Sequence, residues 1–442
     1  MDMKKHALKA NGFTSTKPSN ILIKGGEIID AKGKRKADIL IENGIIKEIS
    51  PGIRRKVDFE INASSYIVLP GAIDIHFHIR EPGKPYEEDI YSGTVSAAHG
   101  GITSLFMMPN TNPSIDSPEL VSFVREKSKE KALVRVFIVG AATQRREGKK
   151  ISEYGLMLKE GIIAVSDDGN AVSSSFAMRK ALEYAKTFGI TVIEHPEDKE
   201  LSGDANEGIL TEKYGFTPYP NAAEDIIVAR DIILAKLTGG NLHLTHISSG
   251  NSISMIREAK RNMKKERITC DVTPHHIIFH DEDIRIDDTN LKVNPPIRSK
   301  KDREEIIEGI LDGTVDAIAT DHAPHPEFLK NNDFPSAPPG ISSADFFLPI
   351  LYYTLVDKGI ITIERLTELI SLNPARIFNI QAGEIDEGKL GDIVIFDPDK
   401  KYTITSDMIL SKGKNFPYLN WSIKGKVVYT IVNGRICYSA DK

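Results

Sequence analysis

The stretch "GAIDIHFHIREPG", residues 71–83, places two histidines one residue apart in an otherwise apolar run. A buried strand is the structure that such a run favours. Side chains at i and i+2 of a strand point to the same face, so we expect His76 and His78 to point together, with Ile75, Phe77 and Ile79 on the opposite face. Two adjacent imidazoles can bind a metal ion. In a purely hydrophobic core, two such polar rings would have no role. This stretch therefore predicts a metal-binding strand end.

Seven further apolar runs follow, and amphipathic segments separate several of them. One such segment, residues 175–188, stops before Gly189, a residue type that ends helices. Eight strands with connections long enough for crossovers predict an α/β fold, a parallel (β/α)₈ TIM barrel. A doubly wound open sheet is the alternative, but no GxGxxG motif follows any strand. The predicted strands are 72–78, 102–108, 134–140, 162–167, 190–195, 241–246, 268–273 and 316–321.

Both ends of the chain contain short β-branched runs separated by glycine turns. Residues 20–69 and 386–442 share this texture, and Asn433-Gly434 is a hairpin signal. We expect the two ends to form one small composite β-sandwich domain beside the barrel domain of residues 70–385.

The composition of the 442 residues, 40% hydrophobic and 27% charged with a net charge of -5, is that of an ordinary soluble protein. It argues against a nucleic-acid partner, and no run approaches the ~20 apolar residues of a membrane span. Cys270 and Cys437 are far apart and form no CxxC motif, which suits a reducing cytoplasm and excludes a cysteine-built zinc site. Residues 1–19 are polar, without a secretory apolar core, and are interpreted as a leader.

Five of the eight predicted strands end in residues that can bind a metal. A lone histidine at a strand end is more often structural, but barrel active sites gather where all strands end. Histidine and carboxylate ligands suit zinc, and this set can hold two ions if one carboxylate bridges them. Water bound by such ions would be a nucleophile at neutral pH, and Asp321 can also shuttle a proton. The strand ends carry His76 and His78, Asp167-Asp168, His195, His246, and Asp321.

Polar residues that could contact a substrate flank the same strand ends. The guanidinium of Arg80 matches a carboxylate, and Asn110 lies in the proline-bracketed turn "MPNTNP". Asn294 in "VNPPIR" and His325 in "ATDHAPH" are further candidates, although each alone is more often an ordinary loop residue. The proline-rich segment 326–341 is interpreted either as a lid over the mouth or as a plain surface loop.

Several motifs resemble those of the type I dihydroorotases of the amidohydrolase superfamily, from about residue 20 to the C-terminus. They are "GAIDIHFHIREPG", "MMPNTNP", "VSDDG", "TPHH", "VNPPIR" and "ATDHAPH". The resemblance implies a TIM barrel with a composite β-sandwich. It also implies zinc-dependent, reversible cyclisation of N-carbamoyl-L-aspartate to L-dihydroorotate, the ring-forming step of pyrimidine synthesis.

The resemblance also implies a role for each matching residue. One zinc would be held by His76, His78 and Asp321, and a second by His195 and His246, with Asp168 as the bridge and Asp321 as general acid/base. The substrate would be bound by five further residues. These are Arg80, Asn110 and His325 for its carboxylate, Asn294 for the amide edge of the ring, and the backbone of Gly340.

Many relatives use a carbamylated lysine as the bridge, but "GIIAVSDDG" offers no lysine at the end of the fourth strand, so an aspartate bridge fits better. Hydantoinases and allantoinases usually carry that lysine. Another cyclic amidohydrolase, an allantoinase or dihydropyrimidinase, is one alternative. A non-catalytic scaffold is the other, although such homologues lose metal ligands and all six are present here. The sequence leaves three questions open: whether one or two ions bind, whether the protein forms a homodimer, and whether it associates with aspartate transcarbamoylase.

Overall fold

A computed structural model describes residues 19–262 and 267–440 of the chain. The leader predicted for residues 1–19 lies outside the described residues except for Ser19. Within the described part, no helix combines the length and the apolar character needed to cross a membrane.

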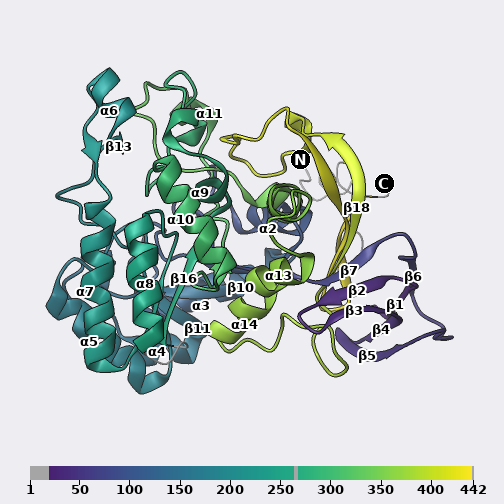
Figure 1. The fold of residues 1–442 in the computed structure, drawn as a ribbon. Helices are drawn as coiled ribbons and strands as arrows, with labels where there is room; N and C mark the ends of the chain where they lie inside the picture. The colour runs from purple at the N-terminus through teal and green to yellow at the C-terminus, as the bar shows by residue number, and fades with distance from the viewer. Residues whose placement is uncertain (1–18, 263–266, 441–442) are drawn as a thin grey trace.

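An eight-stranded parallel sheet forms the centre of the molecule (Figure 1). Its strands pair in chain order, from the first strand to the last, as expected when a crossover connects each strand to the next. All eight predicted strands are present, and the barrel prediction is confirmed. The strands are β8 (Ala72–Phe77), β9 (Ile102–Met107), β10 (Arg135–Ala141), β11 (Ile162–Ser166), β12 (Thr191–Glu194), β15 (Asn241–Leu244), β16 (Ile268–Val272) and β17 (Ala317–Ile318).

The barrel closes where the first strand, β8, meets the chain just after the short last strand, β17. The amide of His78 donates to the carbonyl of His322 at 2.9 Å, and Phe77 forms a parallel bridge with His322. The side chain of Asp74 accepts from the amide of Thr320 at 2.9 Å, across the same seam. These bonds bring the ends of β8 and β17 together, so residues 76–78 face residue 321.

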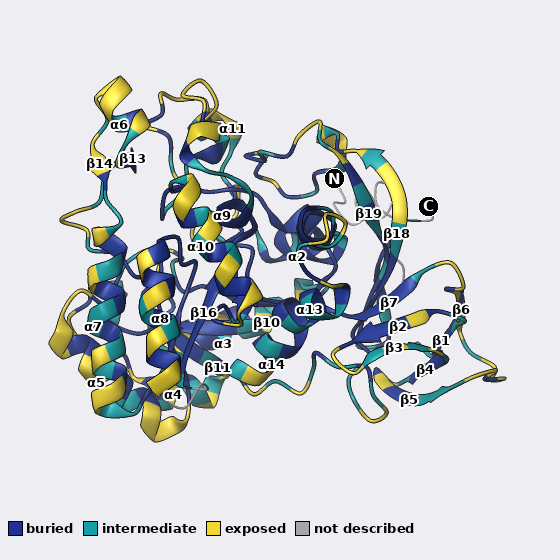
Figure 2. Cartoon of the chain, in the orientation of Figure 1, coloured by how far each residue is buried: buried dark blue, intermediate teal, exposed yellow. Residues whose placement is uncertain are grey.

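Helices cover the outside of the barrel and bury one face each (Figure 2). The helix α5 ends at Gly189 in the left-handed conformation, φ 69°, as its sequence predicts. The longer helices and the two short ones near the mouth are α2 (Ile90–His99), α3 (Pro118–Lys131), α4 (Tyr154–Glu160), α5 (Ser175–Phe188), α7 (Ala222–Thr238), α8 (Gly250–Asn262), α10 (Lys300–Leu311), α9 (Pro274–Ile278) and α11 (Glu327–Lys330).

Two further sheets form a β domain beside the barrel, and one of them joins both ends of the chain (Figure 1). In that six-stranded sheet β7 pairs antiparallel with β18, so that Leu69 lies opposite Val394. The composite β domain is therefore as predicted. Its strands are β1 (Ile21–Lys24), β2 (Glu27–Asp30), β3 (Gly33–Lys36), β4 (Asp38–Glu42), β5 (Ile45–Ser50), β6 (Phe59–Asn62), β7 (Ile67–Pro70), β18 (Ile393–Thr403), β19 (Ser422–Val432) and β20 (Arg435–Ser439).

The alternation predicted along the first barrel strand is wrong for Ile75. Ile75 packs in the cluster of the barrel interior with Ile73, whereas Phe77 and Ile79 pack in the cluster that includes the surrounding helices. The pairing of β8 with β9 shifts between Asp74 and Phe77, and this irregularity changes which side chains face inward. The apolar residues below the shift and the imidazoles above it therefore both point into the barrel.

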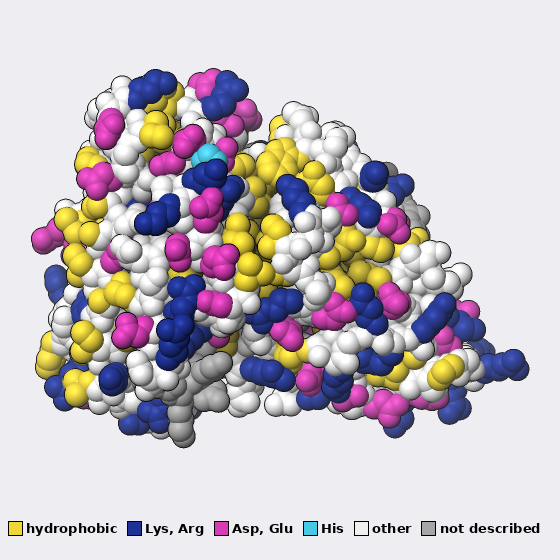
Figure 3. Space-filling model, viewed as in Figure 1, with side chains coloured by type: hydrophobic (Ala, Val, Ile, Leu, Met, Phe, Trp, Pro, Cys, Tyr) yellow, Lys and Arg dark blue, Asp and Glu magenta, His cyan; other side chains and the backbone are white. Residues whose placement is uncertain are grey.

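The face of the molecule in Figure 3 carries basic and acidic side chains in alternation, with no broad basic area. A nucleic-acid-binding face would concentrate lysine and arginine. The charge distribution on this face agrees with the even balance of charges in the sequence.

Candidate functional site

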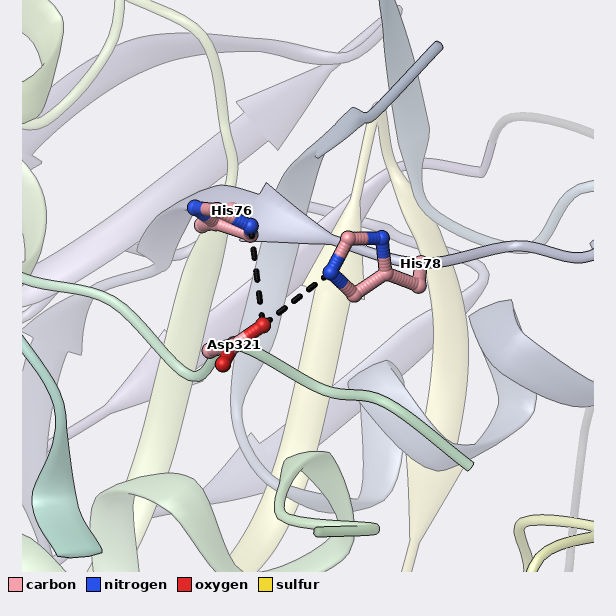
Figure 4. Close-up of side chains that lie close together, drawn as sticks. All are labelled: His76, His78 and Asp321. Atoms are coloured by element: carbon pink, nitrogen blue, oxygen red, sulfur yellow. Dashed lines mark hydrogen bonds and ion pairs between the residues drawn. The ribbon is translucent and has the colours of Figure 1, made fainter. Parts of the chain in front are cut away.

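The histidine pair of the first strand lies beside a carboxylate from the last strand at the mouth of the barrel. The Nε2 atom of His78 is 3.0 Å from Oδ1 of Asp321, and Nε2 of His76 is 3.5 Å from the same oxygen (Figure 4). All three residues are buried, and their ligand atoms lie within 4.8 Å of one another. This grouping is compact enough to hold a metal ion.

Asp168 lies at the centre of the remaining histidines. Its Oδ1 atom is 3.3 Å from Nε2 of His76, 3.5 Å from Nδ1 of His195 and 3.6 Å from Nε2 of His246. Its Oδ2 atom is 3.6 Å from Nε2 of His78. Oδ1 thus faces His76 as well as the second pair of histidines, and Oδ2 faces His78, so one carboxylate contacts both histidine pairs, as a bridging ligand needs to.

The neighbouring Asp167 points away from this cluster. Its side chain accepts hydrogen bonds from the backbone amide of Thr143, at 2.8 Å, and from the hydroxyl of Thr143. Adjacent residues of an extended chain point in opposite directions, so only one of the two aspartates can face the mouth. The structure brings Asp168 into the cluster.

Most strands are shorter than predicted at the mouth, and five of the six ligand-type residues, all except His76, lie just beyond a strand end. The strands β12, β15 and β17 end at Glu194, Leu244 and Ile318. Beyond them, His246 has φ 41° and Asp321 has φ 44°, in the left-handed region that non-glycine residues seldom adopt. Such a conformation costs about 1–3 kcal/mol and is typical of functional sites, where it aims a side chain that a regular strand would misplace.

Hydrogen bonds behind the first histidine pair fix which ring nitrogen faces the cluster. The Nδ1–H of His76 donates to the Thr245 hydroxyl at 2.7 Å, and that hydroxyl donates to Asp271 at 2.8 Å. The Nδ1–H of His78 donates to Oδ1 of Asn110 at 2.9 Å. In the neutral ring each bond places the proton on Nδ1, so Nε2 is the nitrogen that faces the carboxylates and could bind a metal.

The ring of His195 faces the cluster with its other nitrogen, Nδ1. Its Nδ1 faces Asp168 and lies 2.8 Å from Nε2 of His246, while its Nε2 is 2.9 Å from Oε2 of Glu197. Burial opposes the charge on Glu197, but the hydrogen bond and the charge of His195, together with Ser202 and Lys199, outweigh burial and lower the pKa of Glu197 to about 2. Glu197 is therefore ionised and orients the imidazole from behind.

The electrostatics of the cluster favour a bound cation. Burial alone would lower the pKa of His76 and His195, but Asp168 and the other nearby carboxylates together outweigh it and raise the two pKa values to about 9 and about 10. Burial would raise the pKa of Asp168 and Asp321, yet the histidines hold both well below the usual range. The buried Nε2 of His76 and Oδ1 of Asp168 have no hydrogen-bond partner among the described residues. Buried polar atoms left in this way point to a ligand, and the donor set fits a divalent metal.

A cavity of about 250 Å³ opens over the cluster and is lined by each of the five residues predicted to bind substrate. The buried Nε of Arg80 and Oδ1 of Asn294 also lack hydrogen-bond partners among the described residues, so both can still bind a ligand. His76 lies beneath the cavity and does not line it. The lining residues are His78, Arg80, Asn110, Asp168, Gly169, His195, His246, Asn294, Asp321, Ala323, His325, Pro339 and Gly340.

Two buried carboxylates at the site do not figure in the sequence-based prediction. Glu87, 1% exposed, lies 3.8 Å from Nε of Arg80 and 3.5 Å from Nδ1 of His325. No local pattern marks Glu87 as part of the site, because its contact with His325 comes from a loop that is distant in the sequence. Glu197 follows His195 by two residues, so the i, i+2 spacing that drew attention to His76 and His78 was the signal for it.

Comparisons with known proteins agree with this geometry. Residues 67–437 match the model of the amidohydrolase family. The chain is 43% identical over 426 residues to a dihydroorotase of Geobacter sp. (strain M21), covering 95% of this chain and 100% of that protein. It is 44% identical over 425 residues to a dihydroorotase of Caldanaerobacter subterraneus subsp. tengcongensis, covering 96% and 98%.

Among solved structures, the L-hydantoinase of Arthrobacter aurescens superposes with a TM-score of 0.86 at 23% identity, covering 96% of this chain and 97% of that one. This likeness concerns the fold. Together with the family match and the full-length similarity to dihydroorotases, it leads to one assignment. The chain belongs to the amidohydrolase family.

Proposed function

We propose that this protein is a metal-dependent dihydroorotase, which interconverts L-dihydroorotate and N-carbamoyl-L-aspartate. The observation that carries the proposal is one cavity that brings a buried histidine–aspartate cluster together with the guanidinium of Arg80, whose Nε lies 3.8 Å from Glu87 but has no hydrogen-bond partner among the described residues. A hydrolase for a cyclic amide that bears a carboxylate needs both features, one for the reacting bond and one for the charge. The relatives named dihydroorotase, 41–44% identical over nearly the full chain, support the same substrate.

Zinc is the metal we propose, with two ions favoured. His76, His78 and Asp321 would hold one ion, His195 and His246 the other, and Asp168 would bridge them, because its carboxylate lies close to histidines of both groups. A divalent ion bound there would polarise the amide carbonyl and lower the pKa of bound water to about 7.

Asp321 is the residue we assign to proton transfer. It is held as a carboxylate by His78 and His76 despite its burial, so it can accept a proton from the attacking water. In the hydrolytic direction water adds to the ring carbonyl carbon, the bond from that carbon to the ring nitrogen breaks, and Asp321 returns the proton to that nitrogen. Ring closure follows the same path in reverse.

We assign the orientation of the substrate to other residues that line the cavity. Arg80, Asn110 and His325 would bind the substrate carboxylate, with Asn294 at the amide edge of the ring and the Pro339–Gly340 backbone alongside. Burial lowers the pKa of the Arg80 guanidinium, which stays cationic because its ordinary pKa is so high. A buried guanidinium offers several N–H donors in one plane, which suits a carboxylate.

We infer a cytoplasmic location from cysteine usage. Cys270 and Cys437 are both buried and unpaired, as expected of a chain that folds in a reducing compartment.

The test is turnover of L-dihydroorotate by zinc-loaded protein, with allantoin, dihydrouracil and hydantoin assayed in parallel. We expect turnover of dihydroorotate alone, loss of activity after chelation and recovery on adding zinc. Preferential turnover of another ring would refute the substrate assignment while keeping the metal site. Inactivity towards all four compounds with zinc bound would favour the non-catalytic scaffold.

A further inference from the structure

The wall of the cavity formed by Pro339 and Gly340 is anchored by several backbone bonds. The amide of Gly340 donates to the carbonyl of Lys292 at 2.8 Å, and its carbonyl accepts from Nδ2 of Asn415 at 2.8 Å. Nε2 of His325 donates to the carbonyl of Pro339 at 3.0 Å. Gly340 has φ 147°, and a Cβ there would lie 2.5 Å from the carbonyl oxygen of Ala323. The wall is therefore in close contact with the loop that follows Asp321.

A buried lysine lies behind this wall, outside the cavity. Lys330 is the last residue of α11 and is 5% exposed. Its Nζ atom donates to the carbonyls of Pro338 at 3.0 Å, Gly340 at 3.2 Å and Lys292 at 3.4 Å. Among the described residues, no carboxylate forms an ion pair with it.

The contacts of Lys330 join two separate segments that border the cavity. Lys292 belongs to the segment that carries Asn294, whereas Pro338 and Gly340 belong to the wall itself. A buried amino group must replace its lost hydration with other acceptors. Three converging carbonyls do so here, and burial still lowers the pKa of Lys330 to about 7. A lysine kept at such a position, without a carboxylate partner, indicates a role for its N–H donors.

We propose that Lys330 is a positioning residue for substrate binding, whose side-chain nitrogen ties Pro338 and Gly340 to Lys292 and so keeps the wall in place. The residue does not touch the substrate. Segment 326–341 is then a preassembled wall rather than a swinging lid, and Lys330 acts on affinity rather than on the chemical step. The kinetic part of this proposal rests on the proposed function.

The test compares Lys330→Met and Lys330→Gln with Lys292→Met. Lys292 is half-buried and donates to the carbonyl of Pro335 at 2.6 Å, and its substitution keeps the backbone carbonyl that Lys330 uses. For Lys330→Met we expect KM for dihydroorotate to rise about 10-fold with kcat within about 3-fold of wild type. Lys330→Gln, which keeps two N–H donors, should fall in between, and Lys292→Met should match wild type.

Amide hydrogen exchange gives a readout that needs no substrate. We expect exchange of the Gly340 amide to accelerate at least about 10-fold in Lys330→Met, with the barrel strands unchanged. Unaltered KM and unaltered Gly340 exchange in both Lys330 variants would overturn the proposal, as would a loss of kcat alone. If the Met variant does not fold, the Gln variant decides. Failure of wild-type protein to turn over dihydroorotate would overturn the proposed function, and Gly340 exchange would still judge Lys330.

Chemical rescue separates a positioning role from mere packing. In Lys330→Ala, n-propylamine can enter the vacated space and donate to the three carbonyls. We expect millimolar n-propylamine to restore both KM and Gly340 protection, whereas tetramethylammonium, which has no N–H, should restore neither. Equal effects of the two compounds would refute the role of the donors.

Discussion

The two ends of the barrel each carry a cavity, and the smaller one holds the candidate site. The cavity at the amino-terminal ends of the strands is about 660 Å³, against about 250 Å³ at the mouth. In the larger one Arg135 is paired with Asp392, with Nε 2.7 Å from Oδ2, and Arg125 is paired with Glu160. At the mouth, His76 Nε2 and Asp168 Oδ1 are buried without hydrogen-bond partners among the described residues, but so are Ser128 Oγ and Arg435 Nε at the larger cavity. The two cavities differ in chemistry, because, within the described part of the chain, only the one at the mouth has a buried cluster of histidines and aspartates that could hold a metal.

Among the variants that test the chemical difference between the two cavities, Asp321→Asn is expected to have the largest effect. We expect kcat/KM for dihydroorotate to fall by about 10³-fold or more, because the variant loses both a metal ligand and the proton acceptor. Steady-state kinetics would measure this, and the thermal unfolding midpoint should not fall. Activity within 10-fold of wild type would contradict the role of Asp321 and remove the main chemical distinction between the two cavities.

The next largest effect is expected for Glu197→Gln. The carboxylate behind His195 orients its ring, so its loss should weaken zinc binding by about 10- to 100-fold. Competition with a chromogenic chelator would measure the affinity. Glu200→Gln, an exposed position three residues later, is the matched control. Equal zinc affinity in the two variants would show that the contact with His195 is incidental.

Arg80→Lys tests the substrate side of the mouth. The variant keeps the positive charge but loses the planar pair of donors, so KM for dihydroorotate should rise about 10-fold with metal content unchanged. Arg145→Lys is the control, since the Arg145 side chain is 83% exposed. An unchanged KM in Arg80→Lys would exclude the carboxylate contact.

The smallest catalytic effect is expected at the other end of the barrel. Arg135→Met leaves the Asp392 carboxylate, 4% exposed, without its partner, and should lower the free energy of unfolding by about 1–3 kcal/mol. Because this cavity has no chemical role, kcat/KM should stay within twofold of wild type. Denaturant unfolding and kinetics on one preparation would test both. A large kinetic loss would break the distinction drawn between the two ends.

Local sequence patterns were sufficient to predict the barrel and most of the residues at its mouth. Period-2 and period-3.6 patterning predicted the strands and α5, and the strand-end rule drew together His76, His195 and Asp321 from distant stretches. The orientation of Ile75 escaped this reasoning because the irregularity between β8 and β9 depends on strand pairing, which no single strand encodes. Glu87 escaped it because its partners, Arg80 and His325, are 7 and 238 residues away in the sequence.

By itself, the sequence determined the fold class, the composite β domain and the residue types at the mouth, because strand periodicity and strand-end chemistry are local properties of a chain. The tertiary structure decided which aspartate of Asp167-Asp168 enters the cluster and which nitrogen of each histidine faces it. It also decided that Lys330 lies buried among three carbonyls. These choices depend on hydrogen-bond partners contributed by other strands and loops, which come together only when the barrel closes.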